Sequence, residues 1–240
     1  MTTSELLQIA KPIFFETDLV QRILSGNKSA TRRICKDGNV FTVPDMGFYD
    51  GQKRTYAVHN YADKDHTEKL SLVERTCPFC IGDILYVRET WKVHALNPSF
   101  CMMIRYRADN FCDMQVKFSP SRYDMFQKYY KKDGWQSPYF MPKEAARILL
   151  KVIDVRVEHL HDITNEQIIK EGVSRETIDH YMGQVPENTE EWERWAHLLA
   201  FSQLWDSTIK KKDLVLYGWE ANPWVWVVEF ERIEVDLNNY

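Results

Sequence analysis

ARILLKVIDVRVEHL, from Ala146 to Leu160, is the clearest long strand in the sequence. Apolar residues recur at Ile148, Leu150 and Val152, and the recurrence then changes phase to Ile153, Val155 and Val157. Because successive side chains of a strand point to opposite faces, this change of phase predicts a bulge or a sharp bend. Strands bend in this way where a sheet closes on itself. The stretch therefore predicts a curved β-sheet as the centre of the fold.

The regions on either side add shorter strands and helices to this centre. Apolar stretches bounded by turn residues predict strands at 11–15, 54–60, 82–91, 103–108 and 222–235. Helical spacing and capping residues predict helices at 17–26, 164–172 and 190–209. Mixed polarity predicts a loop at 35–50 and a polar, aromatic segment, helical only in part, at 119–135. No linker interrupts the pattern, so we expect one α+β domain over residues 1–240.

The helix expected at 190–209 is the strongest of the three. Trp192, Trp195, Ala196 and Leu199 recur at helical spacing along one side. This periodicity is typical of an α-helix.

Composition limits the classes of function. The chain has 240 residues, 44% of them hydrophobic, and a net charge of −4. A protein that binds long nucleic acids through many phosphates usually carries a basic surplus, so we expect a local basic patch or a small substrate.

The first residues lack a basic region followed by an apolar run, and no apolar run is long enough for a membrane span. We therefore expect a cytoplasmic protein without membrane contacts.

The five cysteines suggest reduced thiols, because their number is odd and they do not form a secreted framework. Cys77 and Cys80, in CPFC, have the spacing of half a zinc site, whose other half is usually a second close pair. Cys101 and Cys112 are too far apart in sequence to supply it. Ordinary turn or buried cysteines are the simpler interpretation, and we expect no metal site.

Residues 121–132, SRYDMFQKYYKK, combine cations with aromatic rings. This composition suits a segment that stacks on bases and pairs with phosphates of single-stranded RNA. A solvated amphipathic segment explains the same pattern more simply. Both interpretations remain open. The residues concerned are Arg122, Lys128, Lys131, Lys132, Tyr123, Tyr129 and Tyr130.

SGNKSATRR, residues 25–33, gathers a lysine, a hydroxyl and two arginines after an expected helix end at Gly26. A lysine whose pKa is lowered by burial or by a nearby cation can take the proton of a threonine hydroxyl and so activate it as a nucleophile. Lys28 and Thr31 can meet only if the backbone turns between them, because strand positions three apart face opposite sides. A helix end followed by a surface lysine and a strand start is the alternative.

Five segments together resemble the ASCH family of small β-barrels related to the PUA fold. Gly26, Lys28, Thr31 and Arg33 match the family signature GxKxxTxR. GDILYVRETW, with Glu89 and Trp91, is similar to the family pattern GDxLxVRExW. Three further segments resemble corresponding parts of the larger phage and prophage members: residues 135–152, 162–173 and 222–230. The resemblance implies a PUA-like barrel with flanking helices, interrupted by insertions at about 36–80, 92–140 and 174–200.

The resemblance also implies a function. A small bacterial member of the family removes the acetyl group from N4-acetylcytidine with a lysine, a threonine and a glutamate. These residues correspond to Lys28, Thr31 and Glu171, and no metal or cofactor is needed. Substrate-binding roles then fall to Arg33 and Arg32 beside them and to Glu89 and Trp91 of the second segment.

The implied activity is amidohydrolysis of an N4-acylated cytosine nucleoside or nucleotide by a cytoplasmic protein of phage or prophage type. Other family members are similar to RNA-binding proteins, and ribonuclease activity is attributed to some. An RNA-binding module for single-stranded or modified RNA, and a ribonuclease, are therefore the alternatives.

Overall fold

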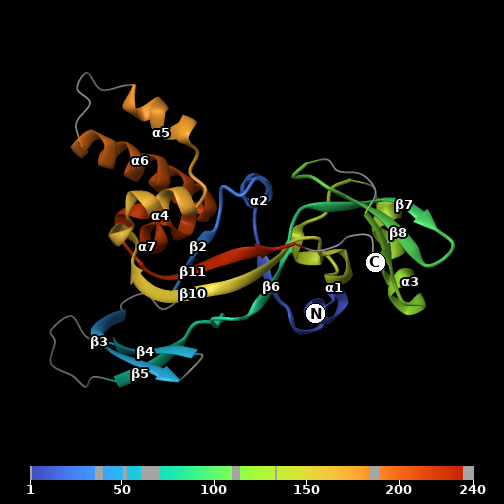
Figure 1. Ribbon diagram of the computed structural model, residues 1–240, viewed down its shortest axis with the longest axis horizontal. Coiled ribbons are helices and arrows are strands. Elements are labelled where there is room, and N and C mark those ends of the chain that lie inside the picture. The colour runs from blue at the N-terminus through green and yellow to red at the C-terminus, as the bar shows by residue number, and fades with distance from the viewer. Residues whose placement is uncertain are drawn as a thin grey trace. The chain divides into compact units, whose positions relative to one another are not determined.

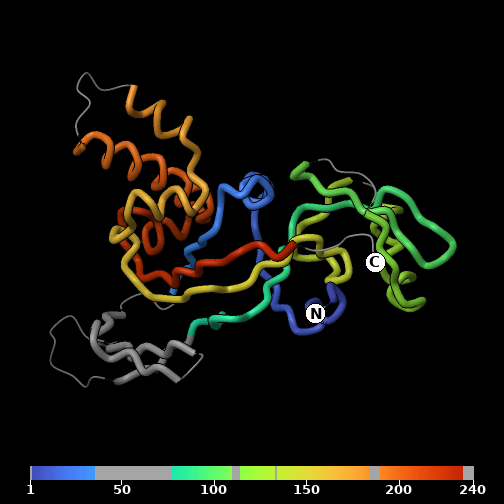
Figure 2. The backbone as a smooth tube through the Cα atoms, viewed as in Figure 1, coloured from blue at the N-terminus to red at the C-terminus, as the bar shows by residue number. Residues whose placement is uncertain are grey.

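The structure is a computed structural model that describes residues 2–35, 40–50, 53–60, 71–109, 114–132, 134–183 and 190–234 (Figure 2). Within 40–76 it describes the backbone of the strands only. The strands are β1 (Lys11–Phe14), β2 (Ala30–Ile34), β3 (Val40–Asp50), β4 (Lys53–Asn60), β5 (Ser71–Thr76), β6 (Ile84–Arg88), β7 (Trp91–Asn97), β8 (Cys101–Tyr106), β9 (Met114–Lys117), β10 (Leu149–His159) and β11 (Trp224–Ile233).

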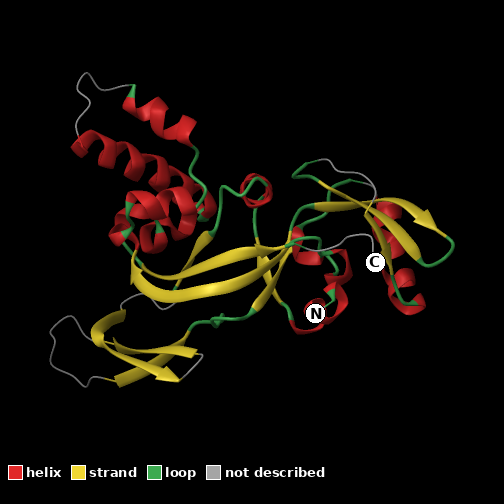
Figure 3. Ribbon diagram, in the orientation of Figure 1, coloured by secondary structure: helices red, strands yellow, loops and turns green. Residues whose placement is uncertain are grey.

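Most of the α-helices lie in the second half of the chain, and among the described residues β2 to β9 follow one another without a helix (Figures 1 and 3). The α-helices are α1 (Thr3–Ile9), α2 (Thr17–Leu24), α3 (Pro120–Lys132), α4 (Asn165–Lys170), α5 (Arg175–Met182), α6 (Glu190–Thr208) and α7 (Leu214–Tyr217). Single 3-10 turns are η1 (Pro138–Phe140), η2 (Lys143–Ala145), η3 (Leu160–Asp162), η4 (Lys211–Asp213) and η5 (Trp219–Ala221). The protein is therefore of the α+β class.

The described strands form three sheets, in the orders β1-β6-β10-β11-β2, β3-β4-β5 and β7-β8-β9. The first sheet is mixed, because β1 runs parallel to β6 while β10 is antiparallel to β6 and β11 to β2. In the part of the chain that is described, none of the three sheets closes into a barrel. Contacts group the chain into two compact units. Unit 1 is Met1–Gly26, Gly82–Lys151 and Glu231–Tyr240, and unit 2 is Asn27–Ile81 and Val152–Phe230.

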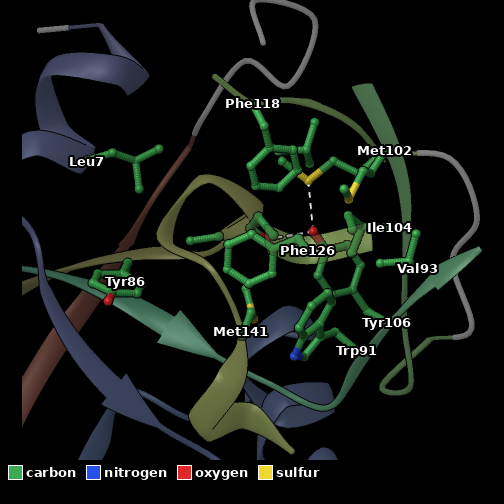
Figure 4. Packing of buried hydrophobic residues seen from close by; sticks show 14 of the residues in the cluster. Leu7, Tyr86, Trp91, Val93, Met102, Ile104, Tyr106, Phe118, Phe126 and Met141 are labelled. Carbon is green, nitrogen blue, oxygen red and sulfur yellow. Dashed lines mark hydrogen bonds between the residues drawn. The ribbon is translucent and has the colours of Figure 1, made fainter. Parts of the chain in front are cut away.

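Unit 1 is built around an aromatic core between β6, the β7-β8-β9 sheet and α3 (Figure 4). Trp91, at the start of β7, is fully buried and packs edge-on against Phe126 of α3. The hydroxyl of Tyr106 donates a hydrogen bond to the carbonyl oxygen of Ala145 at 2.6 Å and lies 3.1 Å from the sulfur of Met114. The polar atom of this buried tyrosine is thereby satisfied, as a buried hydroxyl requires.

Unit 2 packs α4, α5 and α6 against β11. β11 lies between β10 and β2 in the sheet, so both of its edges are paired, and its consecutive residues 225–228 are all buried, so both of its faces are covered there. This explains why an uninterrupted apolar run, rather than an alternating one, forms this strand. α4 starts at a capping box, in which the side chains of Thr164 and Gln167 each bond the backbone of the other residue.

Most of the expected elements are present, with two corrections. Residues 40–50, expected as a loop, form β3, whose pairing with β4 shifts register between Thr42 and Gly47. Residues 120–132 form the regular helix α3 because two aromatic residues three apart, Tyr123 and Phe126, are buried on its inner side. The helix expected at 190–209 is present as α6, which buries Ala196, His197, Ala200, Phe201 and Trp205, while Trp192 and Trp195 are exposed.

In β10 the buried positions change from even to odd between Val152 and Val155, and not at Ile153 as the sequence predicts. Val152 and Val155 are buried, whereas Ile153 between them is 46% exposed. The expected insertions at 36–80, 92–140 and 174–200 contain β3 to β5, most of β7 to β9 with α3, and α5 with the first half of α6. No helix among the described residues is both long enough and apolar enough to cross a bilayer.

Candidate active site

Lys28 lies in a short turn just before β2, within unit 2. Its neighbour Ser29 fixes this turn through the backbone, because the amide of Ser29 donates to the carbonyl oxygen of Lys170 at 2.9 Å. The carbonyl oxygen of Ser29 accepts from the amide of Phe230 at 2.8 Å. The turn is therefore held between the end of α4 and β11, which places the lysine side chain beside α4.

Glu171 is the partner of Lys28 and ends α4 as its C-cap residue. The ammonium nitrogen of Lys28 lies 2.8 Å from a carboxylate oxygen of Glu171 and donates to the main-chain oxygen of the same residue at 2.7 Å. Both residues are buried, with 4% of Lys28 and 5% of Glu171 exposed. Gly172, with a φ of 93°, follows in the left-handed region that ends helices of this kind. The helix end and the turn thus bring together two residues 143 positions apart.

Arg32 binds the second carboxylate oxygen of Glu171. Its guanidinium donates to that oxygen at 3.1 Å, to Glu158 at 2.5 Å and to Gln167 at 2.9 Å. The guanidinium carbon also lies 5.8 Å from the ring centroid of Phe201 in α6. Glu171 is therefore shared between two buried cations, and the two terminal nitrogens of Arg32 are bonded to side chains of α4 and β10. These bonds position Glu171, and the substrate-binding role of Arg32 stays a prediction.

Burial sets the electrostatics of the site. It lowers the pKa of Lys28 below its ordinary value of 10.5, and the nearby charges of Arg33 and Arg32 lower it further, while Glu171 opposes the shift. The pKa of the half-buried Arg33 is likewise lowered by burial, with Glu171 opposing. Three cations thus surround one shared carboxylate. At a given pH, a larger fraction of Lys28 is therefore in the neutral amine form than for an exposed lysine.

Thr31 is only three positions from Lys28 in the sequence, but the side chains of these two described residues are not bonded to each other. It is buried in β2, opposite Val228 of β11. Adjacent residues of a strand face opposite sides, so Thr31 points away from the side on which Arg32 meets α4. Within the described residues, no hydrogen bond joins the hydroxyl of Thr31 to Lys28. The structure therefore brings together Lys28, Glu171 and Arg32, and leaves Thr31 on the opposite face of β2.

Ion pairs extend the site along the sheet beyond what the sequence analysis had identified. Arg156 of β10 pairs with Glu229 of β11 at 2.7 Å and with Glu158 at 3.5 Å. Glu229 also pairs with Lys170 at 2.8 Å. Asp154, Arg156 and Glu158 occupy alternate positions of one predicted strand, and this alternation was a sequence signal for a charged face on β10.

The two remaining predicted site residues, Glu89 and Trp91, belong to unit 1. Both oxygens of Glu89 accept from the guanidinium of Arg147, at 2.8 and 2.9 Å, and Glu89 is fully buried. Burial raises the pKa of this carboxyl group, and its bonds to Arg147 oppose the shift. The indole nitrogen of Trp91 donates to the carbonyl oxygen of Ser137 at 3.3 Å. Both residues are thus engaged in the packing of unit 1.

The cysteines lie apart from this site. Burial raises the pKa of Cys35 to about 12, which keeps it protonated at neutral pH. Cys77 is buried, Cys80 is half-buried, and Cys112 lies outside the described residues. Over the described ranges, no three histidine, cysteine or acidic side chains are grouped as metal ligands.

No protein-family model, curated protein or solved structure matches the chain. What the site can do chemically follows from its own residues. A buried lysine with a lowered pKa, oriented by a carboxylate and flanked by arginines, can accept a proton from a weak acid such as a hydroxyl or a water molecule. The surplus of positive charge around Glu171 can also stabilise a developing oxyanion.

Proposed function

We propose that the protein is an amidohydrolase that removes the acyl group from N4-acylated cytosine nucleosides or nucleotides, built on an ASCH-type, PUA-like barrel. The observation that carries this proposal is the buried contact of 2.8 Å between Lys28 and Glu171. These are two of the three residues to which the resemblance assigns catalysis. A lysine and a carboxylate 143 positions apart have no local reason to meet, so the contact supports a shared role.

The proposed reaction begins at the hydroxyl of Thr31, which attacks the acyl carbonyl carbon. Lys28, as the neutral amine, takes the hydroxyl proton as the new carbon–oxygen bond forms. The resulting oxyanion is stabilised by the neighbouring positive charge of Arg33. When the tetrahedral intermediate collapses, the carbon–nitrogen bond breaks, and Lys28 returns the proton to the departing amine of cytosine. Water then cleaves the threonine ester, releasing the acid and restoring the hydroxyl.

Glu171 orients the lysine in this mechanism. One of its oxygens and its main-chain carbonyl both accept from the ammonium group, while Arg32 fixes the other carboxylate oxygen. Two constraints therefore hold the nitrogen of Lys28 in one position. Orientation of this kind supplies a large part of the rate gained from a general base. Because Thr31 lies on the other side of β2 from Arg32 and Glu171, the proposed step requires the turn before β2 to shift when the substrate is bound, so that Lys28 reaches the hydroxyl of Thr31.

The experiment that tests the proposal measures release of cytidine from N4-acetylcytidine by mass spectrometry. Thr31→Val keeps the size of the buried side chain and removes the hydroxyl, and we expect it to lose activity about a hundredfold or more. Thr31→Ser keeps the hydroxyl and serves as the matched control, with activity within about tenfold of the wild type. Equal activity of the valine variant and the wild type would contradict the role of Thr31.

RNA binding is the second candidate function, and one observation favours it. Four residues near the end of α3 are exposed in unit 1, and the three lysines among them recur at helical spacing, three and four residues apart. Nearby, the ammonium group of Lys92 lies 5.0 Å from the ring centroid of the exposed Trp135. Cations and accessible aromatic rings are the elements of a single-strand binding surface. The four residues of α3 are Lys128, Tyr130, Lys131 and Lys132.

A further inference from the structure

A pocket of about 640 Å³ opens in unit 1, apart from the residues of the proposed reaction. It lies where the parallel strands β1 and β6 both end, since Phe14 at the end of β1 is in register with Arg88 at the end of β6. The carboxyl ends of parallel strands are a frequent place for ligand sites in mixed sheets. The volume is within the range of sites for small molecules.

Aromatic rings form one wall of this pocket. The rings of Phe14 and Tyr139 are nearly parallel, at 13°, with centroids 6.3 Å apart. Tyr139 is 69% exposed, so most of its surface is open to solvent. An aromatic ring in this position offers a flat surface on which another planar ring can stack.

Arg88 contacts both aromatic residues of this wall. Its guanidinium carbon lies 5.4 Å from the ring centroid of Phe14, and it donates to the carbonyl oxygen of Tyr139 at 3.1 Å. Ser137 adds a further constraint, because its hydroxyl accepts from the amide of Tyr139 at the start of η1. The two rings therefore form a preorganised wall, which reduces the entropic cost of binding a ligand.

Polar groups complete the pocket. The exposed carboxylates of Glu16 and Asp18, at the start of α2, line it together with Thr90 and Arg107. Thr90 and Arg107 are tied to each other, because the amide of Arg107 donates to the carbonyl oxygen of Thr90 at 2.9 Å. Carboxylates only accept hydrogen bonds near neutral pH, so the ligand must present donors on its edge. The combination calls for a flat ring with N–H donors at its edge.

We propose that this pocket binds a nucleobase that carries an exocyclic amino group, namely adenine, guanine or cytosine. The base stacks on Tyr139, and its amino group donates to Asp18 or Glu16. All of these residues lie in unit 1, so the proposal does not rest on the reaction proposed for Lys28. The ring wall favours a planar heterocycle over a sugar, whose ring is puckered.

The test uses the full chain and calorimetric titration with adenosine, cytidine and their dimethylamino counterparts, N6,N6-dimethyladenosine and N4,N4-dimethylcytidine. Adenosine and cytidine should bind, and dimethylation, which removes the amino donors, should weaken binding about fivefold or more. Tyr139→Ala should weaken adenosine binding about fivefold to 150-fold, the range for loss of one stacking ring. Tyr139→Phe should bind like the wild type. Glu16→Ala with Asp18→Ala should bind the dimethylated and unmodified nucleosides equally.

Phe140→Ala is the matched control, because Phe140 is an exposed aromatic neighbour, 51% exposed, that does not line the pocket. It should leave binding unchanged. The proposal is overturned if folded wild-type protein binds no nucleoside at millimolar concentration. It is also overturned if Phe140→Ala weakens binding as much as Tyr139→Ala, if dimethylation has no effect in the wild type, or if ribose competes as well as adenosine does.

Discussion

Replacing Glu171 by alanine tests the energetic importance of the buried ion pair. The substitution removes the carboxylate but leaves the backbone, so α4 keeps its C-cap residue. It removes the contact of 2.8 Å to Lys28 and the contact of 3.1 Å to Arg32. Two buried cations, neither more than 4% exposed, then lose a partner that no water molecule can easily replace.

The size of the loss follows from what each cation retains. Removing one partner of a buried ion pair costs about 3–5 kcal/mol in the free energy of unfolding. Lys28 keeps its bond of 2.7 Å to the main-chain oxygen of residue 171, and Arg32 keeps Glu158 and Gln167. We therefore expect a loss near the lower limit, about 3 kcal/mol.

Urea unfolding at pH 7, followed by circular dichroism, measures this loss. Glu166→Ala is the matched control, because it makes the same substitution at an exposed position in the first turn of the same helix. An exposed charge in the first turn stabilises a helix only weakly, through the helix dipole and through charges such as that of Lys170 four residues later, so the control should lose less than about 1 kcal/mol. The double variant Lys28→Met with Glu171→Leu should recover much of the stability, since both charges are then gone.

The reasoning is refuted if Glu171→Ala and Glu166→Ala unfold at the same urea concentration. That result would mean that the charges of Lys28 and Glu171 are solvated in the folded protein. A double variant less stable than Glu171→Ala would equally contradict the account, because it would locate the loss in packing and not in an unpaired charge.

Two further predictions follow from the charges. Burial places the pKa of Lys28 in the folded protein below 10.5, so between the two values the unfolded chain binds a proton that the folded one does not. Stability relative to Lys28→Met should therefore rise with pH in that window, by at most about 1.4 kcal/mol per pH unit, and a pH-independent difference in urea unfolding would contradict this. The second prediction replaces Lys128, Lys131 and Lys132 by alanine. In filter binding to single-stranded RNA, this variant should bind more weakly and with a smaller salt dependence, whereas an unchanged salt dependence would exclude α3 as the binding surface.

The sequence predicted the elements with strong local patterns. β10, β11, α2 and α4 followed from apolar runs and capping residues, because these patterns are formed by residues close in the chain. α3 was underestimated because most of its residues are polar and only Tyr123 and Phe126 are buried. Which residues of α6 are buried was not predicted: Trp192 and Trp195 are exposed, although they are large and apolar.

The site was predictable only in part. The meeting of Lys28 with Glu171 was expected from the resemblance alone, since no local pattern relates residues 143 positions apart. The bonds of Arg32 to Glu158 and Gln167 were not predicted from the sequence. Which face of a strand meets a helix depends on the packing of distant segments, and a short motif does not contain that information.

The most direct measurement of the central claim is the turnover of N4-acetylcytidine by folded Lys28→Arg. An arginine keeps the positive charge beside Glu171, but its guanidinium does not give up a proton near neutral pH. If Lys28 is the general base, the wild type releases cytidine and the arginine variant is slower by about a hundredfold or more. A rate near that of the wild type would contradict the account, because Lys28 would then act only as a cation. Absence of cytidine release by the folded wild type would contradict the proposed activity itself.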